Sequence, residues 1–424
     1  MELLRALLGL VFFCGVAWAL SSARRHFPWR VVLGGLLLQG VLASLVLGTE
    51  GGRAFFERLS AAFTALIAMA EPGAKLVFGP LADPAAMGAV FGNEAGFVFA
   101  FAGTGLAAIL FFSALMAILY HLGLMQVLIF ALAKVMAWTL RVSGAESMAM
   151  AANVFVGQTE APLVVRPYLE RMTRSELNAL MTGGFATIAG SVLAVYIGIL
   201  GDEIGPHLLS ASVLSAPAAF MVAKIMVPET ERPATGGRVE LRFERTATNV
   251  IEAAANGTTD GLKLWLNVIA MLIAFMGLVA LADGILLWVS SSSWIPVELT
   301  LSKIFGWLFA PVAWFMGVEG WHDCQLFGSL LGTKIAVNEF VAFSSLEEML
   351  PGAEGASVLS ERSAKMAAYA LCGFANFASI GIQIGGLGSL APSRRSDLAG
   401  LALRAMLGGA FASWITATIA GVFV

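Results

Sequence analysis

Charged residues are scarce in this sequence, and so are side chains that could bind a metal ion. Only 12% of the 424 residues are charged, about half the fraction in an average soluble domain. Three cysteines and four histidines lie scattered, without the spacing of a disulfide framework or a metal site. The net charge of −3 provides no basic surface for nucleic acid. These shortages exclude an ordinary soluble enzyme, a disordered chain and a disulfide scaffold, and they argue against a nucleic-acid partner.

Long apolar stretches make up most of the chain instead. Hydrophobic residues account for 58% of it, glycines number 46, and the mean hydropathy is +0.84. A helix needs about 20 residues to cross the hydrocarbon core of a bilayer. Eight stretches of at least 18 residues contain no Asp, Glu, Lys or Arg: 6–23, 31–49, 96–120, 177–201, 206–223, 264–282, 366–393 and 405–424. The sequence therefore predicts an all-α polytopic membrane protein with eight transmembrane helices.

Shorter segments between these stretches have other expected roles. We interpret 53–70 as an amphipathic helix in the membrane interface, with a buried packing helix as the alternative. Residues 122–140 are expected to extend the third span, and 304–318 to be interfacial or re-entrant. The first apolar stretch is interpreted as a retained helix rather than a signal peptide, because seven more follow it.

The distribution of positive charge predicts the orientation in the membrane. Arginine and lysine are concentrated in one set of loops, after spans one, three, five and seven and before span four. Because cytoplasmic loops carry an excess of these residues, this set is expected in the cytoplasm, with both termini external. The protein is expected in the cell membrane, surrounded by the lipid bilayer.

Two carboxylates interrupt apolar sequence. Glu160 lies in the segment 147–165, and Glu339 lies in the segment 324–343. A charge at the bilayer centre costs about 2.5–3.5 kcal/mol on the insertion scale, so such a residue persists only beside a cavity or a partner. Because Pro162 also disfavours a continuous helix, we predict two re-entrant helical hairpins. The alternatives are loop acids, with Glu160 beside Arg166 and Glu339 external or paired with Lys334.

The spans that follow the two hairpins are also expected to be broken. Residues 366–393 contain 28 uncharged residues, which as a helix would reach about 42 Å. We expect an interruption near Asn376–Ser379, and a similar one near Thr187–Gly190 in span four, although close helix packing could also explain the glycines there. A repeated arrangement of hairpin and broken helix is typical of secondary transporters with a midplane site formed by inverted repeats.

Three motifs resemble the concentrative nucleoside transporter family. They are Gly157-Gln158-Thr159-Glu160-Ala161-Pro162-Leu163, Val337-Asn338-Glu339-Phe340, and Cys372-Gly373-Phe374-Ala375-Asn376-Phe377 with Ser379-Ile380-Gly381. The match covers roughly residues 90–424, and the N-terminal spans match only in pattern. The resemblance implies a homotrimer in the bacterial inner membrane. It also implies sodium-coupled, elevator-type import of nucleosides such as uridine, cytidine or adenosine, without a cofactor other than sodium as the coupling ion.

The resemblance also implies a division of the chain. Residues 1–120 and 262–318 would form the scaffold part, with three N-terminal spans, the interfacial helix, the long sixth span and an interfacial segment. Residues 144–226 and 319–424 would contain the two hairpins and the broken spans of the transport part, with the fifth and eighth spans. Residues 227–261 are expected to form a cytoplasmic polar loop.

Site residues follow from the same resemblance, by position in the motifs. Gly157 would form the first hairpin tip. Nucleobase contacts would come from Gln158, Thr159, Glu160 and Phe374, ribose contacts from Glu339, Asn376 and Ser379, and a pocket wall from Val192. The sodium site would use Asn153, Val156, Thr187 and Ile188, the two apolar residues through backbone carbonyls. Ala378, where many relatives have serine, leaves the preference between purine and pyrimidine nucleosides open.

Two other kinds of protein remain as alternatives to sodium symport. A proton-coupled carrier of nucleosides or another small polar solute would use Glu160 or Glu339 to carry the proton. A passive channel would not need two opposed hairpins. An intramembrane enzyme is disfavoured, because the sequence contains no GxSxG, HExxH or GxxxxGK[ST] motif.

Overall fold

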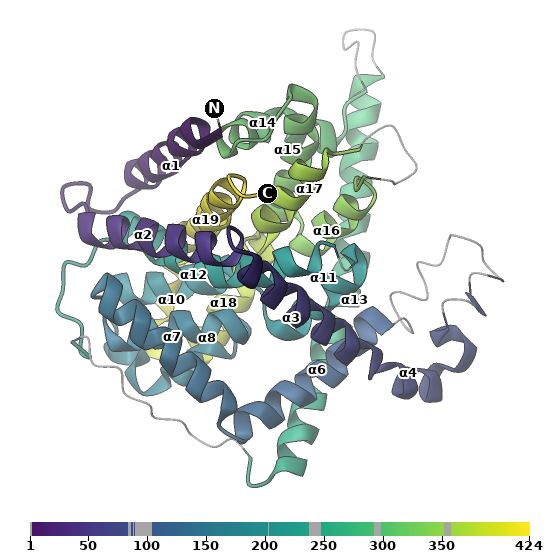
Figure 1. Cartoon of the computed structure of the whole chain (residues 1–424), viewed down its shortest axis with the longest axis horizontal. Coiled ribbons are helices and arrows are strands. Elements are labelled where there is room, and N and C mark those ends of the chain that lie inside the picture. The colour runs from purple at the N-terminus through teal and green to yellow at the C-terminus, as the bar shows by residue number, and fades with distance from the viewer. Residues whose placement is uncertain are drawn as a thin grey trace.

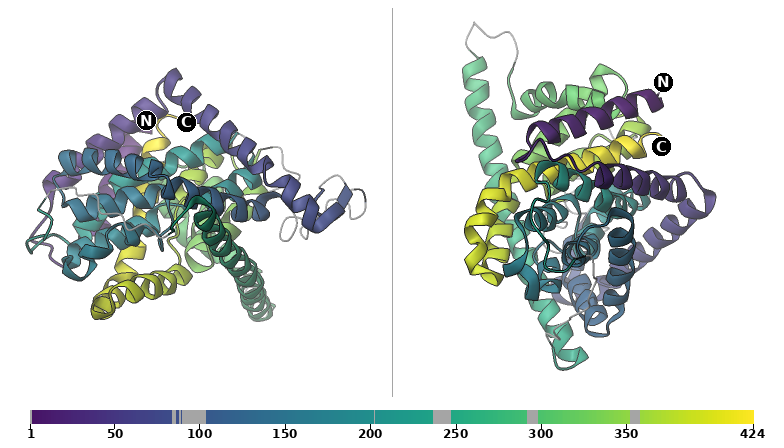
Figure 2. Two further views of the ribbon diagram at one scale, coloured as in Figure 1. Left: turned by 90° about the horizontal axis from the view of Figure 1, so that it is seen from below. Right: turned by 90° about the vertical axis from the view of Figure 1, so that its left-hand side faces the viewer.

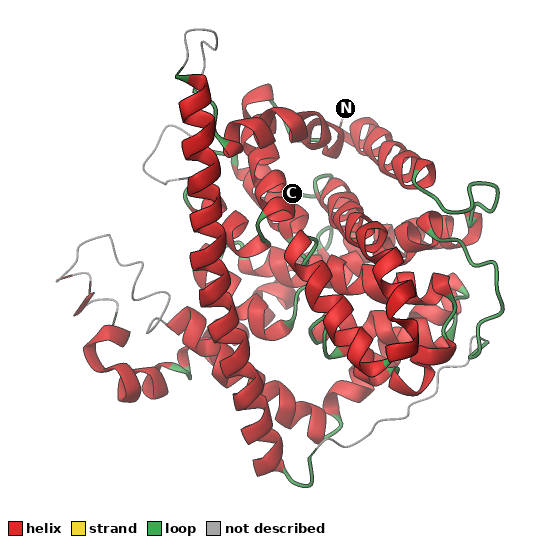
Figure 3. Cartoon of the chain, turned by 180° about the vertical axis from the view of Figure 1, so that it is seen from behind, coloured by secondary structure: helices red, strands yellow, loops and turns green. Residues whose placement is uncertain are grey.

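The computed structural model describes residues 2–83, 86, 87, 89, 104–201, 203–236, 247–291, 298–351 and 358–424. Within these residues every regular element is a helix (Figure 1; Figure 3), which confirms the all-α prediction. Six helices are long and apolar enough to cross a membrane, or up to eight if each of two bent pairs counts as one span. The two ends of the chain lie on the same side of the molecule (Figure 1; Figure 2).

The N-terminal helices follow the apolar stretches closely. The expected spans 6–23 and 31–49 correspond to α1 (Glu2–Ala19) and α2 (Trp29–Val46). The expected amphipathic helix at 53–70 lies in α3 (Glu50–Ala68), where the hydroxyl of Thr49 caps the first turn by accepting from the Gly52 amide at 3.0 Å. It is followed by α4 (Glu71–Phe78) and η1 (Gly79–Ala82). The interfacial location of α3 stays a prediction.

Residues 122–140 do not continue the third span as one straight helix. These residues form a separate helix, α7 (Leu124–Leu140), whose axis is bent by 76° from that of α6 (Thr104–His121). The bend falls at Gly123, whose φ of +84° is a left-handed conformation that glycine adopts without strain. Residues 96–103, the expected start of the third span, lie outside the described residues.

The first predicted hairpin and broken span are both present. The hairpin consists of α8 (Gly144–Phe155), a non-helical tip, α9 (Ala161–Val164) and η3 (Arg166–Arg171). The fourth span consists of α10 (Arg174–Ala186) and α11 (Gly190–Leu200), separated at Thr187–Ala189. Ser143 with Glu146 and Thr173 with Glu176 form capping boxes that begin α8 and α10.

The fifth and sixth spans differ in burial. In α12 (Gly205–Met226), 94% of the most apolar 18-residue stretch is buried inside the molecule, whereas in α13 (Val250–Ser290) the share is 6%. The long α13 therefore lies along the outside of the molecule (Figure 1; Figure 3). The prediction of a loop over 227–261 is wrong in its last part, because α13 begins at Val250. The side chain of Asn249 starts this helix by accepting from the Glu252 amide at 2.9 Å.

The second half of the chain repeats the order of hairpin, broken span and whole span. Its helices are α14 (Leu301–Met316), α15 (Trp321–Ala336), α16 (Glu339–Glu347), α17 (Glu361–Leu371), α18 (Phe377–Leu390), η4 (Pro392–Arg394) and α19 (Arg395–Ala420). The expected segment 304–318 lies in α14, which is bent by 111° from α15. The interruption of span seven falls at Cys372–Asn376, slightly before the expected position, because the helix resumes at Phe377 and already includes Ser379.

The core forms where the two halves meet. The helices α10 and α12 from the first half both pack against α19 from the second, and α12 also contacts α17. Most residues of these four helices are buried, and many of the buried residues are small. Close packing of small residues holds membrane helices together where lipid provides no hydrophobic driving force. The core therefore supports both broken spans, which meet next to it.

Candidate functional site

The second hairpin places Glu339 at the centre of a polar contact network. Asn338 ends the tip and caps α16, with its side-chain oxygen accepting from the Val341 amide at 2.9 Å. The Tyr196 hydroxyl on α11 donates to Glu339 Oε1 at 2.9 Å, and Asn376 Nδ2 donates to Oε2 at 2.8 Å. Only 7% of Glu339 is exposed. The carboxylate therefore links the second hairpin to both broken spans.

The interruption of span seven prepares one polar face of α18. Asn376 caps this helix, and its Oδ1 accepts from the Ser379 amide at 2.8 Å. Positions 376, 379 and 383 lie on the same side of an α-helix because they are three and four residues apart. The N-termini of α16 and α18 both lie beside Glu339, where their partial positive charge stabilises a carboxylate.

The first hairpin tip reaches the same face of α18. The helix α8 ends at Phe155, and the Gly157 amide donates to Glu160 Oε2 at 3.1 Å, which folds the acid back over the tip. Gln383 Nε2 donates to Gln158 Oε1 at 3.0 Å and also to the carbonyl of Met181 on α10 at 3.1 Å. Gln383 therefore joins the first hairpin, span four and span seven.

Both hairpin tips thus contact the same helix, α18. Their contacts on α18, at Asn376 and Gln383, are seven positions apart, which is roughly 10 Å at the helical rise. The side chain of Ser379 lies between them in sequence and is buried. Other predicted contacts surround this strip: Val192 is buried one turn before Tyr196 on α11, Phe374 is half-buried in the interruption of span seven, and Thr159 is exposed at the tip.

Glu160 faces a cavity of about 200 Å³ next to the first tip. The opposite wall comes from Tyr120 on α6 and from Asn256 and Asp260 on α13. Arg166 lines the same cavity. The alternative that places Glu160 beside Arg166 is therefore retained in part. The Glu160 carboxylate is therefore placed between the first hairpin and the helices α6 and α13.

Four predicted sodium ligands cluster where α8 and α10 end. Thr187 Oγ1 donates to the Asn153 carbonyl at 2.7 Å and to the Gly183 carbonyl at 2.9 Å, and the side chains of both Asn153 and Thr187 are buried. Asn153 Oδ1 is buried and has no hydrogen-bond partner in the described part of the chain. Val156 directly follows α8, and Ile188 is the second residue after α10, where carbonyls leave the helical pattern. Buried neutral oxygens of this kind suit a hard monovalent cation.

Comparison with known proteins decides the family. The profile for the C-terminal part of Na⁺ dependent nucleoside transporters matches residues 207–421, the profile for their N-terminal part matches residues 8–81, and a nucleoside recognition profile matches residues 106–203. The chain belongs to the Na⁺-dependent nucleoside transporter family. It is a membrane transporter and not an enzyme.

Several relatives match this chain over nearly its whole length. An uncharacterized transporter of Haemophilus influenzae is 44% identical over 100% of this chain and 98% of its own. The mouse sodium/nucleoside cotransporter 1 is 40% identical over 99% of this chain and 64% of its own. A solved structure of CNTnw in an inward-facing substrate-bound state has 42% identity and a TM-score of 0.91, covering 100% of this chain and 98% of that one. The expected family and fold class are confirmed.

Three residues of this transporter that take part in the network were not among the predicted site residues. Tyr196 and Gln383 contact the two hairpin tips. Lys334 is fully buried, and its Nζ donates to the carbonyls of Ala370 at 3.0 Å and Cys372 at 2.8 Å. No ion pair joins Lys334 to Glu339 in the structure as described, so the alternative pairing of these two residues is wrong.

Proposed function

We propose that this chain imports nucleosides by symport with sodium. The observation that carries the proposal is the convergence of Gln158 from the first repeat and Glu339 from the second on one face of α18, through Gln383 and Asn376, next to the unpartnered Asn153 Oδ1. A carboxylate and amides can bind a sugar diol and a base edge, because they offer both acceptors and donors. The nucleoside would lie between the hairpin tips, with its ribose towards Glu339 and its base towards Gln158 and Phe374.

Sodium would bind before the nucleoside. The ion would be coordinated by the side-chain oxygens of Asn153 and Thr187 and by the carbonyl oxygens of Val156 and Ile188. It would thereby fix the first hairpin against the interruption of span four. The same hairpin carries Gln158, whose hydrogen bond to Gln383 extends this ordering to α18. Coupling of this kind is reciprocal, so the nucleoside would raise the affinity for sodium by the same factor.

Transport would occur by an elevator movement in a homotrimer. The transport part, with both hairpins and both broken spans, would move against a scaffold part that includes α6 and α13. The cavity beside Glu160 supports this division, because its two walls come from the two proposed parts. We further propose that the protein lies in the bacterial inner membrane with both termini external. The two ends of the chain lie on the same side of the molecule, which supports this topology.

Uptake into proteoliposomes tests the function directly. Vesicles would be loaded with potassium and diluted into sodium or choline buffer with radiolabelled uridine or adenosine. We expect uptake above the choline level for at least one nucleoside, and accumulation above the external nucleoside concentration that is lost when sodium is equal on both sides. A pH gradient that drives uptake without sodium would instead favour the proton-coupled alternative, with Glu160 beside its cavity as the proton carrier.

A further inference from the structure

The two repeats carry different residues at the position that faces the broken span. Asn153 lies three residues before Val156, the C-cap residue that follows α8, and Lys334 lies three residues before Val337, the C-cap residue that follows α15. The local sequences are Asn153-Val154-Phe155-Val156 and Lys334-Ile335-Ala336-Val337. The following broken spans correspond in the same way, because Thr187 is the C-cap residue of α10 and Cys372 is the C-cap residue of α17.

Both positions bridge the hairpin and the broken span, although through different contacts. In the first repeat, Asn153 Nδ2 donates to the Leu180 carbonyl on α10 at 3.3 Å, and Thr187 Oγ1 donates to the Asn153 carbonyl at 2.7 Å. In the second repeat, the Lys334 ammonium crosses from the hairpin to the broken span and donates to the Cys372 carbonyl at 2.8 Å. Its second acceptor, the Ala370 carbonyl, belongs to the last turn of α17. The first repeat thus has an unpartnered oxygen where the second has a buried cation.

Chemistry explains the difference. The last carbonyls of a helix lack partners within it and lie at the negative end of its dipole. The Lys334 ammonium satisfies two such oxygens at the end of α17 without a carboxylate in ion-pair range among the described residues. In the first repeat, by the function proposed above, sodium has this role at the end of α10.

We propose that Lys334 is a tethered cation that replaces a second sodium ion in the second repeat. It holds the interruption of span seven in the conformation in which Asn376 donates to Glu339. Glu339 lies five residues after Lys334, and Asn376 lies four residues after Cys372. The ribose side of the site is therefore ordered permanently, and only the base side waits for sodium. This inference rests on the proposed function and predicts that one sodium accompanies each nucleoside.

Two variants of Lys334 and one control test the proposal by equilibrium nucleoside binding at a range of sodium concentrations. Lys334→Met removes the charge at similar length, Lys334→Asn restores the residue of the first repeat, and Lys263→Met alters an exposed lysine on α13. We expect Lys334→Met to weaken nucleoside binding at least about tenfold at saturating sodium, the effect of removing charge-assisted hydrogen bonds. Lys263→Met is expected to bind like the wild type.

The sodium dependence of Lys334→Asn separates a tethered cation from a merely structural lysine. We expect its Hill coefficient for sodium to rise from about one to about two, because the second repeat can then take up an ion. Sodium is also expected to raise its thermal stability more than that of the wild type, which can be measured without any nucleoside. If neither the Hill coefficient nor the sodium effect on stability changes in Lys334→Asn, the proposal is overturned. It is also overturned if Lys334→Asn stays unfolded at every sodium concentration.

The wild type separates this inference from the proposed function. Failure of the wild type to bind nucleosides in sodium would contradict the function itself. Sodium-dependent binding by the wild type, with Lys334→Met binding equally well, would contradict only the role of Lys334.

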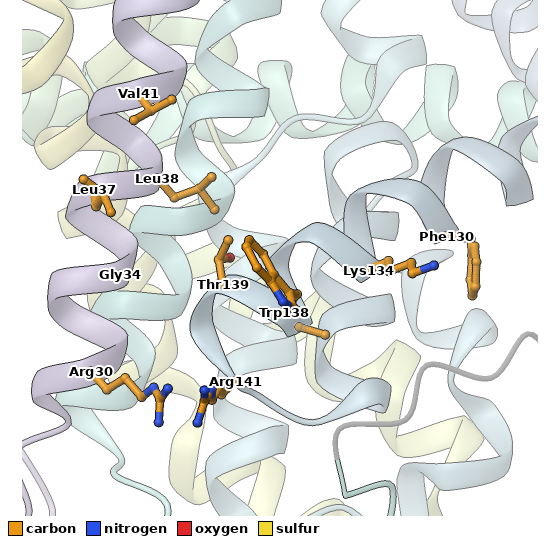
Figure 4. A pocket seen from close by; sticks show the side chains of 11 residues that line it. Arg30, Gly34, Leu37, Leu38, Val41, Phe130, Lys134, Trp138, Thr139 and Arg141 are labelled. Atoms are coloured by element: carbon orange, nitrogen blue, oxygen red, sulfur yellow. The ribbon is translucent and has the colours of Figure 1, made fainter.

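A second site lies on the outer surface, between α2 and α7. A groove of about 1030 Å³ is lined along its length by Leu37, Leu38, Val41 and Trp138 (Figure 4). At one end the side chains of Arg30 and Arg141 point toward one another, whereas Lys134 points away from them (Figure 4). Neither arginine has a hydrogen-bond or ion-pair partner among the described residues. Two facing guanidinium groups without an acid form a site for an anion.

The geometry points to an anionic phospholipid in this groove. A phosphate can accept hydrogen bonds from both arginines, and an acyl chain would cover Leu37, which is 70% exposed, and Trp138, which is 81% exposed. Basic pockets between membrane helices are suited to such head groups on the cytoplasmic side. Both arginines belong to the loops that the positive charge assigns to that side.

Native mass spectrometry of the detergent-solubilised protein tests the lipid site. We expect retained phosphatidylglycerol, no comparable retention of phosphatidylcholine, and loss of the retained lipid in the double variant Arg30→Gln/Arg141→Gln. Arg25→Gln, an exposed arginine outside the groove, is the control and should retain the lipid. Equal retention of both lipids, or retention by the double variant, would overturn the proposal. Displacement of the lipid by inorganic phosphate alone would likewise contradict it, because the groove would then bind the free anion.

Discussion

The Tyr196 hydroxyl donates to the Glu339 carboxylate across 143 positions of sequence. This contact connects the second hairpin of the C-terminal half to the broken span of the N-terminal half. Together with Asn376, it leaves the carboxylate oriented and buried but still able to accept further hydrogen bonds, because each oxygen has more than one lone pair. The proposed ribose contacts depend on this orientation.

Replacement of Glu339 by glutamine should nearly abolish nucleoside uptake. The amide cannot accept hydrogen bonds at both of its terminal atoms, so the contacts to Tyr196, Asn376 and ribose hydroxyls cannot all be kept. We expect nucleoside affinity to fall by about tenfold to a hundredfold, the range for hydrogen bonds to a charged group. Glu348→Gln, at an exposed position just after α16, is the matched control. Normal uptake by Glu339→Gln, at unchanged oligomer size on a sizing column, would exclude Glu339 from the site.

Removal of the Tyr196 hydroxyl should have a smaller effect. Tyr196→Phe keeps the ring packed against Phe343 but removes one donor from Glu339. We expect nucleoside affinity to fall about fivefold, as for one typical hydrogen bond. Isothermal calorimetry with Tyr168→Phe as the control measures this. An affinity equal to that of the wild type would show that Tyr196 does not orient the carboxylate.

Gln158 and Gln383 should act as one unit. Alanine at either position breaks the same hydrogen bond between the first hairpin and α18, so the second substitution should cost less than the first. We expect a coupling free energy of about 0.5–3 kcal/mol in a double-mutant cycle on nucleoside affinity, as for residues in direct contact. Additive effects of the two substitutions would contradict a direct link between the hairpin tip and span seven.

Substitution of Asn153 or Thr187 should act through sodium. Asn153→Ala removes the unpartnered Oδ1, and Thr187→Ala removes the hydroxyl that bridges α8 and α10. Both variants are expected to need more sodium for half-maximal nucleoside binding, with affinity approaching the wild-type value at very high sodium. A loss of nucleoside affinity that no sodium concentration reverses would assign these residues to structure or to the substrate site instead.

Gly373→Ala should destabilise the crossing of the two broken spans. Gly373 has a φ of +99°, and a Cβ there would lie 2.5 Å from the Phe185 carbonyl oxygen. Both the backbone conformation and the close approach favour glycine. We expect a loss of at least about 1 kcal/mol in stability, seen as a lower melting temperature. Gly381→Ala, where a methyl group would meet open space, is the control and should melt near the wild-type temperature.

The sequence predicted the interruptions better than the contacts between them. The polar and proline-containing tips at Glu160 and Glu339 mark breaks locally, because such residues disfavour a continuous apolar helix. Tyr196 and Gln383 carry no comparable signal, since a single tyrosine or glutamine in a helix does not say which helix it faces. The partners of Lys334 are backbone carbonyls, which every residue has, so no sequence pattern could identify them.

One wrong prediction had a local signal against it in the sequence. The division implied by the resemblance places residues 250–261 in the polar loop. Asn249 followed by Glu252 is nevertheless a helix start of the capping type, and the structure begins α13 there. The bend at Gly123 was missed for a different reason, because glycine inside an apolar stretch is also common in unbroken membrane helices.

Equilibrium binding of a nucleoside in sodium and in choline tests directly whether sodium and nucleoside binding are coupled in this transporter. The purified transporter would be titrated with uridine and adenosine in each salt at equal ionic strength, alongside Asn153→Ala. The account predicts that sodium raises the affinity of the wild type for at least one nucleoside by about fivefold or more, a typical coupling between two sites, and that Asn153→Ala loses most of this gain at moderate sodium. Nucleoside affinity that is the same in sodium and choline would contradict it.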